Sequence, residues 1–207
     1  MRRTMIVWLS VLIHVVACLG LLLVQGGTEA EPEMAKRAKW IAEQTPLWTT
    51  VWVFWALAST SLWAVFVVWA SRLCEQGAPR TVVLGGCLLC GVGVLFDLSG
   101  EIVNIVGLTQ PGLSLSEFAE RAWLFTLLSP GIANGIYCVA GLALSAVSWR
   151  TGLLRDWLGL LGLCMWVDGV LLTMVAFLNN RVGMVVTGAG VMVLFIPWAA
   201  LTGWRLR

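Results

Sequence analysis

Charged residues are scarce in this chain of 207 residues, where Lys, Arg, Asp and Glu together make up 12%. A soluble globular domain carries about 25% charged residues, so the composition excludes an ordinary soluble domain. The formal net charge is only +2, which gives no basis for a nucleic-acid partner. We therefore look for function inside a membrane.

Histidine and familiar catalytic motifs are also lacking. The single histidine, His14, excludes bis-histidine haem ligation by this chain alone and argues against a histidine-based metal site. The sequence has no G-x-S-x-G, no H-E-x-x-H and no glycine-rich phosphate loop with a lysine. We expect no metal site, and no cofactor can be identified from the sequence.

Long apolar runs dominate what is present. Hydrophobic residues make up 59% of the chain, and the mean hydropathy is +0.90. A membrane-spanning helix needs about 20 such residues. The sequence predicts an all-α fold, a polytopic integral membrane protein with a six-transmembrane-helix bundle as one domain over residues 1–207. The expected helices are about 5–24, 47–70, 82–108, 123–148, 157–178 and 182–203, with an extracytoplasmic loop at 25–46 that includes a surface helix near 34–44.

The basic residues indicate an orientation. If the N-terminus is inside, eight basic residues lie in cytoplasmic segments and five on the other side, which agrees with the positive-inside rule. We therefore expect both termini to be cytoplasmic, in a bacterial inner membrane. The inner set is Arg2, Arg3, Arg72, Arg80, Arg150, Arg155, Arg205 and Arg207, and the outer set is Lys36, Arg37, Lys39, Arg121 and Arg181.

Tryptophan occurs at 13 positions, and aromatic belts at the two membrane interfaces would explain most of them. Trp55, Trp63 and Trp166 lie deeper in their runs and are candidate pocket walls. The residues assigned to the belts are Trp8, Trp69, Trp149, Trp157, Trp198 and Trp204 inside, and Trp40, Trp48, Trp52 and Trp123 outside.

The third run carries a stripe of small and polar residues at alternating spacings of four and three. Such spacing keeps the residues on one helix face, and small residues let neighbouring backbones approach closely. We expect this helix to be the central and most enclosed one. The stripe is Gly86, Cys90, Gly93, Asp97, Gly100, Asn104 and Gly107; shorter versions are Pro130, Asn134, Tyr137 and Gly141, and Gly159, Gly162, Trp166, Gly169, Thr173 and Ala176.

Three acids, Asp97, Glu101 and Asp168, lie inside apolar runs that contain no Lys or Arg. An acid at the centre of a transmembrane helix costs roughly 2.5–3.5 kcal/mol on insertion scales, so such residues usually have a function. We expect at least one to be protonated, or a cation to lie among them. The alternative is a structural polar network that joins helices.

Polar residues also share a depth. Five runs place a polar side chain within about two residues of the run's midpoint: His14, Ser59 with Thr60, Asp97, Asn134 and Asp168. We expect a shared site at mid-membrane, in which Asp97, Asn134 and Asp168 converge. The predicted ligand-binding residues are Asp97, Glu101, Asn104, Asn134, Asp168, His14, Trp166 and Tyr137.

Cys87 and Cys90 form a C-x-x-C pair inside the third run. We interpret them as small packing residues, since free cysteine is readily buried and no thioredoxin-like context surrounds them. Binding of a soft metal with Cys74 is the alternative.

Three functions remain open. The favoured one is a small permease or an ion- or proton-handling protein. In a membrane-embedded enzyme acting on a lipid or isoprenoid, Asp97, Glu101 and Asp168 would be the catalytic acids and bases. An accessory subunit of a membrane complex needs no site. The expected partners are the lipid bilayer and a small molecule or ion, with a homodimer or larger membrane complex possible.

Overall fold

The computed structural model describes residues 2–205, and in this part the chain consists of helices joined by turns and short loops, without a strand. Residues 1, 206 and 207 lie outside it, Arg207 of the inner basic set among them, and the side chain of Arg2 is not described either. Two π-helical segments, η2 and η3, interrupt longer helices. The elements are α1 (Arg2–Leu23), η1 (Gln25–Gly27), α2 (Met34–Glu43), α3 (Thr45–Glu75), α4 (Arg80–Ile102), η2 (Val103–Gly107), α5 (Leu115–Thr126), η3 (Leu127–Ala133), α6 (Asn134–Thr151), α7 (Trp157–Phe177) and α8 (Arg181–Arg205).

Among the described residues, six helices are long and apolar enough to span a membrane. Five match the predicted runs closely. The fourth is longer, because α5, η3 and α6 form one continuous helix from Leu115 to Thr151 instead of starting near Trp123. Its early start has a local cause, a capping box in which Ser114 and Glu117 satisfy each other's backbone N–H groups.

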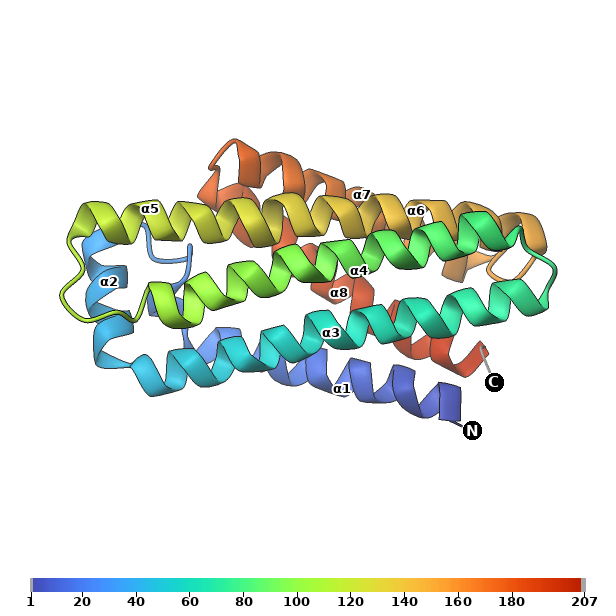
Figure 1. Cartoon of the computed structure of the whole chain (residues 1–207), viewed down its shortest axis with the longest axis horizontal. Helices are drawn as coiled ribbons and strands as arrows, with labels where there is room; N and C mark the ends of the chain where they lie inside the picture. The colour runs from blue at the N-terminus through green and yellow to red at the C-terminus, as the bar shows by residue number, and fades with distance from the viewer. Residues whose placement is uncertain (1, 206–207) are drawn as a thin grey trace.

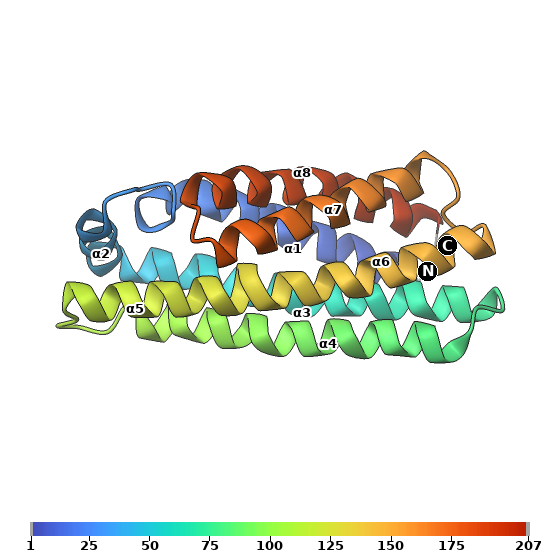
Figure 2. The same ribbon diagram turned by 90° about the horizontal axis from the view of Figure 1, so that it is seen from above.

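The six long helices form two layers. Helices α1, α7 and α8 make one layer, and α3, α4 and the α5–α6 helix make the other (Figures 1 and 2). Neighbours follow the order α1, α3, α4, α6, α7, α8 and back to α1. Both ends of the described chain lie at one end of the bundle, and α2 lies at the other (Figure 1). Ion pairs Arg3–Glu75 and Arg205–Asp156 join helices at the first of these ends.

Helix α4 is not the most enclosed helix, so that expectation was wrong. It packs against α3 on one side and against η3 and α6 on the other, and a smaller share of it is buried than of α3 or of Leu115–Thr151. Its opposite face carries Leu84, Leu88 and Leu95, each more than half exposed. The small-residue stripe itself is buried except for half-buried Gly107. The narrow stripe of small residues is enough for α4 to pack between its two neighbouring helices, while the other faces of α4 remain on the outside of the bundle.

Aromatic side chains build two interior clusters, which corrects part of the belt assignment. Trp48, Trp52, Trp69 and Trp198 are buried in the bundle. Glycines make room for them: a Cβ at Gly162 would lie 2.6 Å from Nε1 of Trp198. Five of the residues assigned to a belt are exposed, as a membrane-interface belt requires: Trp8, Trp123, Trp149, Trp157 and Trp204. The cluster nearer to α2 contains Trp40, Trp48, Trp52, Trp55 and Phe125. The cluster farther from α2 contains His14, Phe66, Trp69, Trp166, Phe195 and Trp198.

Candidate functional site

Asp97 lies in the middle of the bundle and accepts hydrogen bonds from three hydroxyl groups. Ser59 of α3 reaches Oδ2 at 2.6 Å, Tyr137 of α6 reaches the same oxygen at 3.1 Å, and Ser129 of η3 reaches Oδ1 at 2.5 Å. The Asp97 side chain therefore joins α4 to both of its neighbours. Only 8% of Asp97 is exposed, so these hydroxyl groups replace water as its surroundings.

Glycines on either side of Asp97 let two of these donors approach. A Cβ at Gly93 would lie 2.6 Å from Cε1 of Tyr137, which is closer than side-chain atoms can pack. A Cβ at Gly100 would lie 3.0 Å from Cβ of Ser129. The glycines of the stripe thus leave space on the surface of α4 where the side chains of Tyr137 and Ser129 pack.

The position of Ser129 depends on the π-helical segment η3. Pro130 follows Ser129 and cannot donate a backbone N–H, and its ring crowds the carbonyl one turn earlier. The helix widens there into a π turn, a feature that often occurs at functional sites. Thr173 of α7 hydrogen-bonds the Gly131 carbonyl in this segment at 3.4 Å. Sequence reasoning missed Ser129 as a partner of Asp97, although the proline within an apolar run was a signal.

Glu101 and Asn104 continue from Asp97 along α4 and η2, and their polar atoms lack partners. Glu101 is 2% exposed and Asn104 is 1% exposed. Within residues 2–205, Oε2 of Glu101 and both polar side-chain atoms of Asn104 have no hydrogen-bond partner. Buried polar groups are nearly always satisfied by protein, water or a ligand, so these atoms make this part of α4 the candidate site.

Helix register places two tryptophans of α3 opposite this part of α4. The Ser59–Asp97 hydrogen bond sets the register of these antiparallel helices, which lie side by side in both views (Figures 1 and 2). One turn further along each helix, Trp55 is opposite Glu101, and after the next turn Trp52 is opposite Asn104. The indole Nε1 atoms of Trp52 and Trp55 are buried and also without a partner in the described part of the chain.

In the described part of the chain, no basic side chain pairs with the acids inside the long helices. The six ion pairs found within residues 2–205 involve none of Asp97, Glu101 and Asp168. Arg121, on the fourth long helix, instead binds the Gly107 carbonyl at 2.7 Å and Gln110 at 2.6 Å.

The structure does not join the other predicted site residues to Asp97. Asp168 is half-buried and its Oδ2 lies against α8, where a Cβ at Gly190 would be 2.3 Å away. Asn134 bonds the Gly169 carbonyl at 2.5 Å and Thr173 at 2.9 Å, which ties α6 to α7. In the described chain, no hydrogen bond connects either residue to Asp97.

His14 and Trp166 lie in the aromatic cluster, and neither has a hydrogen bond to Asp97 in the described chain. Nδ1 of His14 bonds the Ser10 carbonyl at 2.8 Å, and its ring packs on Phe195 at 4.5 Å. Nε1 of Trp166 donates to Ser145 at 3.1 Å. Of the eight predicted ligand-binding residues, four therefore line one column: Asp97, Glu101, Asn104 and Tyr137.

The cysteines form no metal centre in the described residues, where no three Cys, His, Asp or Glu side chains gather as metal ligands would. Cys87 contacts the Phe66 carbonyl at 3.4 Å through its thiol, as a packed side chain does.

Comparisons with protein families, with curated proteins and with solved structures found no match for this chain. The fold and site define a six-helix protein with a buried acidic column between α3, α4 and the α5–α6 helix.

Proposed function

We propose that this chain is an integral membrane protein that takes up and passes a proton or a small cation at Asp97 and Glu101. The observation that carries the proposal is a pair of buried carboxyl groups one helical turn apart with no basic partner among the described residues. Two unpaired charges at this depth are too costly to persist, so at least one carboxyl binds a proton or cation.

The hydroxyl of Ser59 supports the proton in particular. Its Oγ lies 2.6 Å from Oδ2 of Asp97 and 3.1 Å from the Trp55 carbonyl, but it has one hydrogen to donate. When Asp97 is ionised, that hydrogen points to the carboxylate. When Asp97 is protonated, Oδ2–H donates to Ser59, which then donates to the Trp55 carbonyl. The same heavy-atom positions thus accommodate both forms, as a proton carrier requires.

Glu101 and Asn104 extend the route towards the α2 end of the bundle. Glu101 is the next acid along α4, and helix register places Asn104, Trp52 and Trp55, whose side chains also have partnerless polar atoms, within the next turns. Ordered water between these groups would satisfy them and could carry a proton between Asp97 and that end. We further propose that this end is extracytoplasmic, since the excess of arginine is at the opposite end.

A flux assay on the full chain tests the proposal. We expect vesicles containing the purified protein and a trapped pH-sensitive dye to dissipate an imposed pH difference faster than protein-free vesicles. Asp97→Asn should abolish the excess flux, because an amide keeps the shape but cannot exchange a proton. Glu101→Gln should reduce it. The same vesicles with sodium or potassium gradients distinguish a cation from a proton.

Two controls make the result specific. Asp168→Asn removes an acid from the same kind of helix outside the column and should retain flux. Ser59→Ala should reduce flux severalfold, whereas Ser99→Ala on the exposed face of α4 should not. If wild-type vesicles dissipate none of these gradients faster than empty ones, the proposal is wrong, and the enzyme and accessory-subunit hypotheses gain support.

A further inference from the structure

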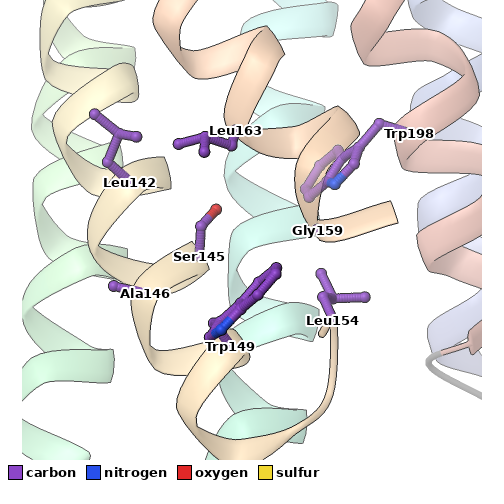
Figure 3. A pocket seen from close by; sticks show the side chains of 8 residues that line it. All are labelled: Leu142, Ser145, Ala146, Trp149, Leu154, Gly159, Leu163 and Trp198. Carbon is purple, nitrogen blue, oxygen red and sulfur yellow. The ribbon is translucent and has the colours of Figure 1, made fainter. Parts of the chain in front are cut away.

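A hollow lined by other residues than the acidic column lies between α6 and α7, close to the end that holds both termini. It has a volume of about 290 Å³, and Leu142, Ala146, Trp149, Leu154 and Leu163 are among the residues around it (Figure 3). The lining is almost wholly apolar. Its one hydroxyl, on Ser145, already accepts a hydrogen bond from Trp166.

The hollow is built by the turn between α6 and α7. Gly159 has no side chain, and a Cβ there would lie 2.2 Å from the Leu154 carbonyl, so the turn can fold tightly over the start of α7. Trp149 is 45% exposed and Leu163 is 44% exposed. The hollow is therefore reached from the outer surface of the bundle, where acyl chains lie if α6 and α7 cross a bilayer.

In the sequence, two arginines follow residues that line the hollow. Arg150 follows Trp149, Arg155 follows Leu154, and both are exposed. Neither makes an ion pair or side-chain hydrogen bond with the rest of residues 2–205. Asp156, the acid next to them, is already engaged, since it caps Leu158 of α7 at 3.1 Å and pairs with Arg205.

We infer that this is a binding site for an anionic phospholipid, with one acyl chain in the hollow and the phosphate group held by Arg150 and Arg155. An apolar hollow alone would accept any hydrocarbon. The two exposed arginines next to lining residues add a preference for a negative headgroup, worth about a fivefold gain in affinity per arginine near a membrane surface. The exposed Trp157 at the same turn suits the headgroup level.

The test is lipid binding to the purified full chain, measured by native mass spectrometry during titration with phosphatidylglycerol or with phosphatidylcholine of the same acyl chains. We expect tighter binding of phosphatidylglycerol. Arg150→Gln and Arg155→Gln should each weaken it about fivefold. Arg80→Gln, which removes an exposed arginine from the same end of the bundle at the start of α4, should leave it unchanged.

A second pair of variants tests the hollow separately from the charges. Ala146→Phe fills it and should weaken phosphatidylglycerol binding although both arginines remain. Val139→Phe places the same aromatic side chain at an exposed position of α6 outside the hollow and should have no effect. Equal binding of the two lipids, an Arg80→Gln loss as large as that of Arg150→Gln, or full binding by Ala146→Phe would overturn the inference.

Discussion

At the scale of single residues, the chemistry of this protein centres on how Asp97 is surrounded. A buried acid without a basic partner is met by three hydroxyls from two neighbouring helices, one of them from the only tyrosine of the chain. Hydroxyls are suited to this task because each can donate to a carboxylate or accept from a carboxylic acid. A lysine or arginine in their place would fix Asp97 in its ionised form.

The glycine beside Asp97 provides a prediction at this scale. Gly93→Ala should push the Tyr137 ring away, reduce proton flux, and lower the free energy of unfolding by about 1–3 kcal/mol, as overpacking of a tight interface does. Gly85→Ala on the same helix is the control, since a Cβ there meets nothing within 4 Å. Thermal unfolding followed by circular dichroism, together with the flux assay, measures both effects. Equal behaviour of the two variants would contradict the assigned role of Gly93.

At the scale of elements, two π-helical segments distinguish this site from one built only of regular α-helices. Segment η2 contains Asn104, whose backbone carbonyl accepts from Nε1 of Trp48 at 3.1 Å. Segment η3 contains Ser129 and Pro130. Each π turn shifts the residues that follow it around the helix axis, so both alter which side chains face the acidic column.

Pro130→Ala tests whether η3 is needed. Removing the proline should let residues 127–133 return to a regular helix and raise the free energy of unfolding by about 1–3 kcal/mol, while Ser129 turns away from Asp97 and flux falls. Pro197→Ala removes the other helix-interior proline, in α8, and should leave flux intact. Higher stability with unchanged flux in Pro130→Ala would show that the π turn does not serve the site.

The elements also show what could be predicted from the sequence and what could not. Apolar runs located all six long helices, and heptad spacing brought Asp97 and Tyr137 onto facing stripes. Equal depth predicted that Asp168 and Asn134 would join them, but the described chain shows no hydrogen bond from either to Asp97. Depth is one coordinate, and the angle around each helix axis is another. Pro130 signalled an irregular helix near Ser129, but it did not show that Ser129 would face Asp97, since a π turn breaks the periodicity on which helix-face assignments depend.

At the scale of the whole molecule, the described chain has its two ends together and α2 at the far end (Figure 1). A labelling experiment tests the proposed orientation: Ala35→Cys in α2 should react with a membrane-impermeant maleimide from outside intact cells. Gln76→Cys in the α3–α4 turn should react only after permeabilisation. Both positions are exposed. The reverse pattern would invert the orientation, and labelling of both from one side would contradict the spanning of α3.

The central claim is that Asp97 gains and loses a proton inside the bundle. Infrared difference spectroscopy of the reconstituted protein across a pH titration measures this directly, because a protonated carboxyl has its own C=O band. The account predicts a reversible carboxylic-acid band that is absent in Asp97→Asn and unchanged in Asp168→Asn, with its frequency altered in Ser59→Ala. An identical set of carboxyl bands in wild type and Asp97→Asn would contradict it.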